Sequence, residues 1–186
     1  MRTNAIRAPR KYLANDDELA VYIASRGGGD VTEHRGNYVI REVSIHDARQ
    51  RATPTSLDLE GFELASQPTR VDDFYDDARI ADIFDPEVKA LVSDITGAAR
   101  VEIFDHTKRS SSVQRQEEMV IREAASIIHN DYTARSGVKR LRDHFADDPD
   151  EAERLLKRRF AIINVWRSIA GPVCRERYLE SYSTKS

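Results

Sequence analysis

Cysteine is almost missing from this sequence, since Cys174 is the single thiol among 186 residues. One cysteine cannot form a disulfide within the chain, so a disulfide framework is excluded and a reducing, cytoplasmic location is expected. Long apolar runs are missing as well, because no stretch approaches the roughly 20 residues of a membrane-spanning helix. The opening MRTNAIRAPRK has no apolar core of the kind that a secretory signal needs. We therefore expect a soluble protein with no membrane partner.

An excess of one charge is also lacking. Lys and Arg total 29 and Asp and Glu total 32, which leaves a formal net charge of −3. The basic clusters at 7–11 and 157–159 are short and flanked by acids, whereas a nucleic-acid-binding face needs a sustained basic patch. Nucleic acid is therefore not an expected partner. Hydrophobic residues make up 40% of the chain and charged residues 33%, which is typical of a globular protein.

Two widespread catalytic motifs are absent. The sequence has no G-x-S-x-G nucleophile elbow, which argues against a hydrolase of that kind. Its glycine-rich stretch, RGGGD at 26–30, lacks the Lys and Ser/Thr of a phosphate loop and the spacing of a dinucleotide-binding turn. We interpret that stretch as a turn.

The spacing of apolar residues predicts an α+β, mainly β fold. Residues 37–49 alternate with period two, as a strand does, and 71–97 repeat at three and four, as a helix does. A break is expected at Asp85-Pro86 and an end at Gly97. The other expected elements are strands at 18–26, 61–69, 99–107, 121–133 and 160–173, a loop or short helix at 133–145, and a helix within 146–159 with Asp148 as N-cap and Pro149 first.

The stretch SIIHNDYT (126–133) carries the main candidate site. On a strand, His129 and Asp131 would point to the same face, because side chains alternate with period two. An imidazole and a carboxylate converging on one point make two thirds of the facial triad of non-heme Fe(II) oxygenases. The alternative is the polar end of an ordinary strand. His106 is either a third ligand or a ring hydrogen-bonded at a strand end.

Polar residues also interrupt the apolar stretch FAIINVWRSIAGPV (160–173). Arg167 within such a strand needs a carboxylate partner or a route to solvent. It is either a contact for an anionic co-substrate, since guanidinium pairs bidentately with carboxylate, or part of a structural salt bridge. Asn164 lies nearby in the same predicted strand.

Three stretches in series resemble one protein family: VEIFDHTKRSS (101–111), REAASIIHNDYTARSGVKRLRD (122–143) and RRFAIINVWRSIAGPV (158–173). It is the family of non-heme iron oxidoreductases related to the cephamycin 7α-methoxylase subunit, gibberellin desaturases and fungal meroterpenoid 2-oxoglutarate oxygenases. The earlier VSIHDAR (43–49), TPTSLDLEGFEL (53–64) and VDDFYDD (71–77) are similar to the start of that family.

The resemblance implies a double-stranded β-helix, or jelly roll, with a helical insertion at 71–97. It implies Fe(II) held by His129 and Asp131, with 2-oxoglutarate as co-substrate. Asn164 and Arg167 fall on the family's strand as expected contacts of the cofactor site. The implied activity is hydroxylation or desaturation of a small organic metabolite, as in secondary metabolism.

The chain departs from this family after Val173. The following CRERYLESYSTKS (174–186) resembles nothing in the family, and no histidine follows His144, so the distal histidine ligand has no counterpart. The expected organisation is an N-terminal arm (1–17), an incomplete, C-terminally truncated oxygenase domain (18–173) and a divergent polar tail (174–186). An uncovered apolar strand at its end predicts self-association or a complementing chain.

Two further hypotheses follow from this departure. In one, the chain is a non-catalytic remnant or binding module with the same fold. In the other, the resemblance is misleading and the chain is a plain α+β interaction domain. Iron content and succinate formation distinguish these hypotheses from an active oxygenase.

Overall fold

The computed structural model describes residues 5–14, 21–23, 33–110, 112, 117–118, 121–122, 127–169 and 171. The chain divides into two compact units, which are described separately. The first unit comprises residues 1–66 and 104–152, and the second comprises 67–103 and 153–186. No helix in the described part of the chain is long and apolar enough to cross a membrane.

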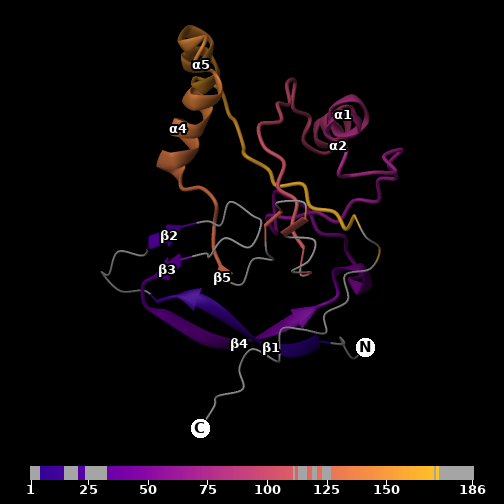
Figure 1. Ribbon diagram of the computed structural model, residues 1–186, viewed down its shortest axis with the longest axis vertical. Coiled ribbons are helices and arrows are strands. Elements are labelled where there is room, and N and C mark those ends of the chain that lie inside the picture. Colours follow the sequence, from indigo (N-terminus) through magenta and orange to yellow (C-terminus); the bar gives the residue numbers. More distant parts are fainter. Residues whose placement is uncertain are drawn as a thin grey trace. The chain divides into compact units, whose positions relative to one another are not determined.

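A three-stranded sheet organises the first unit, in the order β4-β1-β5 (Figure 1). The strands β1 (Ala5–Leu13) and β4 (Tyr38–His46) are antiparallel over their full length, whereas β5 (Ile127–Ile128) joins β1 in parallel. The predicted strand at 37–49 is thus confirmed. The predicted loose arm is wrong for residues 5–13, which form β1. Its Pro9 lacks an N–H donor, and β5 pairs with β1 only beyond it, at Lys11 and Tyr12.

A second, two-stranded antiparallel sheet pairs β2 (Val21–Ile23) with β3 (Glu33–Arg35). It confirms the centre of the strand predicted at 18–26. The predicted turn at 26–30 lies outside the described residues, as does the predicted tail at 174–186.

Two helices follow β5 along the chain, α4 (Ala134–His144) and α5 (Pro149–Leu156). The helix α4, which the sequence left open as loop or helix, begins at a capping box. The Thr133 hydroxyl accepts from the Ser136 N–H at 3.2 Å, while the Ser136 hydroxyl accepts from the Thr133 N–H at 2.8 Å. The prediction for α5 is confirmed, since Pro149 is its first residue and Asp148 accepts from the Glu151 N–H at 3.1 Å.

The second unit contains a continuous helical stretch over 77–96 made of α1 (Asp77–Arg79), a π-helical turn (Ile80–Phe84) and α2 (Asp85–Thr96). The expected break at Asp85-Pro86 is wrong. Instead, the Asp85 N–H bonds to the Ile80 carbonyl, and this wider turn comes directly before Pro86, which has no N–H to donate. Gly97 ends α2 at φ 67°, a left-handed conformation that glycine adopts without strain.

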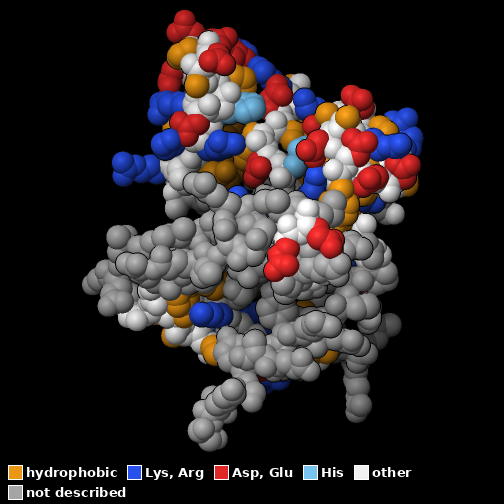
Figure 2. All heavy atoms as spheres, in the orientation of Figure 1, with side chains coloured by type: hydrophobic (Ala, Val, Ile, Leu, Met, Phe, Trp, Pro, Cys, Tyr) orange, Lys and Arg blue, Asp and Glu red, His pale blue; other side chains and the backbone are white. Residues whose placement is uncertain are grey.

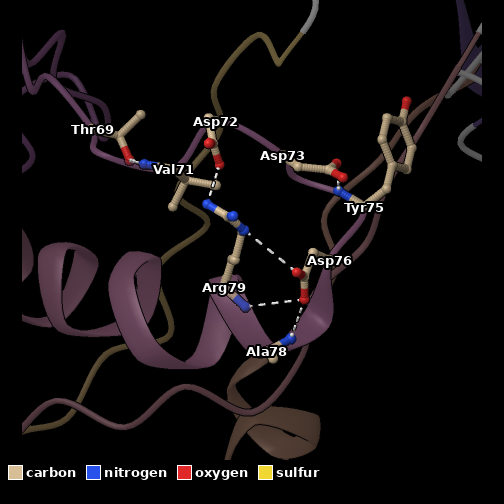
Figure 3. A network of polar contacts seen from close by, with 8 residues as sticks. All are labelled: Thr69, Val71, Asp72, Asp73, Tyr75, Asp76, Ala78 and Arg79. Atoms are coloured by element: carbon tan, nitrogen blue, oxygen red, sulfur yellow. Dashed lines mark hydrogen bonds and ion pairs between the residues drawn. The ribbon is translucent and has the colours of Figure 1, made fainter.

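A polar network fixes the start of this helical stretch (Figure 3). The Asp76 carboxylate caps α1 by accepting from the N–H groups of Ala78 at 2.9 Å and Arg79 at 3.2 Å. The Arg79 guanidinium in turn pairs with Asp72 at 2.5 Å and with Asp76 at 3.4 Å. The two bonds to Asp76 provide acceptors for N–H groups of the first turn, which have no acceptor within the helix.

Three predicted strands are wrong over the described residues. Segments 61–69, 99–107 and 160–169 form no ladder, and the strand predicted at 121–133 is reduced to β5 and an isolated bridge between Arg109 and Arg122. Alternation and β-branched content suit a strand, but a strand forms only where another strand pairs with it. The jelly roll stays a prediction, because two such small sheets do not test it.

Candidate metal site

The two predicted ligands, His129 and Asp131, follow directly after β5. Their side chains converge, with His129 Nε2 3.3 Å from Asp131 Oδ1. They lie beyond the end of the strand rather than on it, so strand alternation does not produce their approach. Both side chains are about half exposed, at 47% and 46%, so a small molecule can reach them.

A backbone contact orients the His129 ring. Its Nδ1 lies 2.8 Å from the carbonyl oxygen of Ile127. A carbonyl oxygen only accepts, so Nδ1 carries the proton in this hydrogen bond, which leaves Nε2 on the side of Asp131. Histidine ligands of metals commonly donate their other N–H to a carbonyl or carboxylate, which fixes the tautomer.

The separation of the two side chains fits a shared divalent ion. Two donors about 2.1 Å from one ion and about 90° apart are separated by about 3.0 Å, and the observed separation is 3.3 Å. The same geometry also suits an ordinary exposed His–Asp ion pair, which contributes about 0–1 kcal/mol. The contact therefore fits both the metal site and the polar strand end.

The described residues place no third metal ligand at this pair. Within the described ranges, no group of three or more His, Cys, Asp and Glu residues could hold a metal ion. The candidate His106 is exposed on the segment 99–107, which is not a strand. The chain's own described residues thus offer one imidazole and one carboxylate.

An aromatic cluster lies next to this pair along the chain. The Tyr132 ring meets the Phe104 ring edge to face, with centroids 6.4 Å apart, and the His144 ring lies at the same distance from Phe104. The Arg140 guanidinium carbon is 4.3 Å from the centre of the Phe104 ring. Sequence analysis missed this cluster, although Arg140 and His144 are four apart and so share one face of α4.

Asn164 and Arg167, the predicted cofactor contacts, belong to the second unit. Arg167 Nη2 donates to the Gln67 carbonyl at 3.2 Å, and its guanidinium carbon lies 5.8 Å from the Phe74 ring and 6.0 Å from the Phe84 ring. These contacts hold segment 160–169 to the start of the helical stretch and favour the structural role for Arg167. Asn164 is exposed, and the cofactor contact stays a prediction for both residues.

Perturbed carboxyl groups lie away from the His129–Asp131 pair in the chain. The pKa of Glu87 is lowered, first because the Thr69 hydroxyl donates to it at 2.6 Å and then because Arg70 donates from its backbone at 3.1 Å and its guanidinium at 3.3 Å. The pKa of Glu102 is lowered chiefly by Arg100, which donates at 2.7 Å. Glu87 joins segment 69–70 to α2, and Glu102 joins segment 99–103 to α2 through Lys89 at 3.4 Å, so we interpret both groups as structural.

Residues 11–176 match the YDMC family, described as an oxidoreductase/YMDC permease-like domain. The chain belongs to this family. Among curated relatives of this YDMC domain, Oxidoreductase AN1597 of Emericella nidulans is 29% identical over 171 residues, covering 85% of this chain and 54% of that protein. The hydroxylase/desaturase CTB9 of Cercospora beticola is 32% identical, covering 76% of this chain and 47% of that protein.

A third relative of the YDMC domain, the hydroxylase/desaturase efuI of Hormonema carpetanum, is 29% identical over 76% of this chain and 50% of its own length. This chain therefore spans about half the length of these three relatives. No solved structure matches it. The family description and the names of these three relatives are those of oxidoreductases, hydroxylases or desaturases.

Proposed function

We propose that this chain belongs to an Fe(II)- and 2-oxoglutarate-dependent oxidoreductase that hydroxylates or desaturates a small organic metabolite, with His129 and Asp131 as metal ligands. The observation that carries the proposal is the 3.3 Å approach of His129 Nε2 to Asp131 Oδ1, in a family whose relatives are named oxidoreductase and hydroxylase/desaturase. The resemblance of the HNDYT and NVWR stretches supplies the type of metal and co-substrate.

Fe(II) and 2-oxoglutarate, when bound, supply the oxidising power that removes hydrogen from an unreactive C–H bond. The residues of the chain would bind and orient these two groups. The carbonyl of Ile127 contacts Nδ1 of His129 and so orients the ring with Nε2 toward Asp131, whose carboxylate would offset part of the charge of a dication. Tyr132, the residue after Asp131, is half-buried against Phe104, and this contact anchors the backbone next to the candidate ligand.

The alternative is a binding module without turnover. The observation that favours it is the two-ligand set, since no third His, Cys, Asp or Glu joins the pair among the residues that the structure describes. A pair of ligands binds iron weakly and leaves its coordination geometry open. Catalysis then requires a ligand from another segment or another chain.

The test is anaerobic titration with Fe(II), with and without 2-oxoglutarate, followed by O2 and an assay for succinate. We expect wild type to bind iron, and His129→Ala and Asp131→Asn each to reduce the affinity at least tenfold. His46→Ala is the matched control, because His46 is also an exposed histidine next to a strand end, in β4. Iron binding that survives both substitutions at the pair refutes the site. Iron binding without succinate supports the binding module.

A further inference from the structure

The strand β4 has an open edge, because the described strands of its sheet follow the order β4-β1-β5 (Figure 1). The Ala14 N–H donates to the Asn37 carbonyl at 2.8 Å, in the register that pairs β1 with β4. Hydrogen-bonded pairs recur at every second position of an antiparallel ladder, so the odd-numbered residues of β4 bond to β1. The even-numbered residues direct their backbone N–H and C=O groups away from β1, and no described residue bonds to these groups. Four of these outward residues are exposed: Ile40, Glu42, Ser44 and His46.

This edge lacks the features that keep edge strands from pairing with another chain, such as proline, lysine or a bulge. In β1, Pro9 lies opposite Glu42 in a pair without hydrogen bonds, so its missing N–H is on the edge away from β4. The strand β4 has no proline, glycine or lysine, and its 9 residues pair with β1 one to one. Hydrophobic side chains of this sheet also reach the surface (Figure 2), with Ile40 61% exposed. The outer edge of β4 is therefore a template for a further strand.

The charges of β4 are complementary to those of a second β4. A two-fold axis perpendicular to the sheet makes two edge strands antiparallel and keeps the faces of the two sheets aligned. With the axis at Ser44, Arg41 lies opposite the partner's Asp47 on both sides of the axis. Glu42 lies opposite the partner's His46, whose ring can donate a hydrogen bond to a carboxylate. This register therefore brings groups of complementary charge and hydrogen-bonding capacity together.

Apolar residues continue across the same junction. Val43 and Ile45 are half-buried, and in this register Val43 lies opposite the partner's Ile45 on both sides of the axis. Pairs of aliphatic residues and pairs of opposite charge both stabilise a sheet. The extended backbone continues through Asp47, at φ −76° and ψ 109°, so this residue can stand opposite the partner's Arg41.

Other symmetric registers match less well. An axis at Arg41 or Glu42 sets two like charges directly opposite each other, which destabilises the pairing. An axis at Ile40 or Val43 leaves both charged residues opposite uncharged side chains. The axis at Ser44 is therefore the register that the sequence of β4 favours.

We propose that the chain forms a symmetric dimer in which β4 pairs antiparallel with β4 of a second copy about Ser44. The two sheets then join into one, and Glu42 exchanges both backbone hydrogen bonds with the partner's His46. A contact made by one strand is small, so the dimer is weak and its population rises with protein concentration. This inference requires neither the metal nor the co-substrate of the proposed function.

The first experiment is sedimentation velocity of the full chain between about 1 and 200 µM. We expect wild type to shift from monomer to dimer over this range. Ser44→Pro removes an N–H that points away from β1, at a position where an edge strand tolerates proline, and is expected to stay monomeric. Ser44→Ala is the matched control, because it keeps the N–H and should dimerise as wild type does. Arg41→Glu places a like charge opposite the partner's Asp47 and should weaken the dimer by about tenfold or more.

The second experiment tests the register by disulfide cross-linking in a Cys174→Ser background, which removes the single native thiol. Ser44→Cys should form a covalent dimer under mild oxidation, because directly opposed residues of a hydrogen-bonded pair have Cα atoms about 5.5 Å apart, within reach of a disulfide. Glu42→Cys is the matched control on the same edge. In the proposed register it lies about 14 Å from its own copy, so it should not cross-link.

Circular dichroism checks the fold of each variant, and if Ser44→Pro fails to fold, the cross-linking decides. A wild type that stays monomeric over the whole range overturns the inference. So does association that persists unchanged in folded Ser44→Pro, since it would then use another surface. An equal loss of association in Ser44→Ala, or cross-linking of Glu42→Cys as efficient as that of Ser44→Cys, overturns it as well.

Discussion

Thr133 is the residue whose replacement should most directly loosen the segment after the candidate ligands. It caps α4, which begins three residues beyond Asp131, and its hydroxyl accepts from the Ser136 N–H at 3.2 Å. Thr133→Ala removes that acceptor but leaves the reciprocal bond, in which the Ser136 hydroxyl accepts from the Thr133 N–H at 2.8 Å. One N–H at the start of the helix is then left without a side-chain acceptor.

The expected cost is about 1 kcal/mol in free energy of unfolding, the typical loss when a capping threonine becomes alanine. For a chain of this size, a change of that magnitude lowers the midpoint of thermal unfolding by about 2–4 °C. Urea unfolding followed by circular dichroism measures the free energy directly. Affinity for iron, where it is measurable, should fall with it.

Thr133→Ser is the matched control, because serine caps a helix at least as well as threonine. It should unfold at the same urea concentration as wild type. A Thr133→Ala variant as stable as wild type, or a Thr133→Ser variant as unstable as Thr133→Ala, would refute the role of this cap.

Three other predictions test the second unit. Gly97→Ala should cost about 1 kcal/mol through backbone strain alone, since φ is 67° and a Cβ there would meet no atom within 4 Å; Gly97→Asn should cost less in the same urea assay, and equal costs would contradict this. Because the folded-state pKa of Glu87 is lowered from 4.5, its contribution to stability is present above pH 4.5 and is lost as pH falls through the lowered value. Thr69→Val should reduce that acid sensitivity in urea unfolding between pH 3 and 6, and an unaltered pH profile would count against the contact. Trp166, the single tryptophan, is 76% exposed, so its fluorescence should be readily quenched by acrylamide at low protein concentration; protection that grows with concentration would reveal self-association through segment 160–169.

Local signals in the sequence predicted the elements that depend on neighbouring residues. The alternation at 37–49 gave β4, and Pro149 after Asp148 marked the start of α5. Gly97 predicted the end of α2, because glycine adopts the left-handed conformation with less strain than other residues. Each of these features is decided by a few adjacent side chains, so a single sequence suffices to find it.

Features that depend on distant partners were not predicted. Residues 5–13 look like a loose arm because of their charges and Pro9, yet β4 offers them a full antiparallel ladder. Residues 160–169 look like a strand, yet no ladder forms there among the described residues. The partner of a strand decides its formation, and alternation does not name that partner.

The features of the candidate site also divide into those that adjacent residues predict and those that depend on distant partners. His129 and Asp131 were found from their spacing, although their approach arises after the strand rather than within it. The contact between Arg140 and Phe104 joins residues from different segments, and nothing in either local sequence announces it. The four-residue spacing of Arg140 and His144 predicts only that the two side chains share one face of α4.

The parallel pairing of β5 with β1 has a consequence for the order of folding. Lys11 pairs with Ile127, so β1 leaves the ribosome long before β5, the strand that completes its sheet. Pairings of such long sequence separation form slowly, since a large loop must close first. The backbone that carries His129 is therefore expected to become ordered late, and the unpaired edge of β1 is exposed to other chains until then.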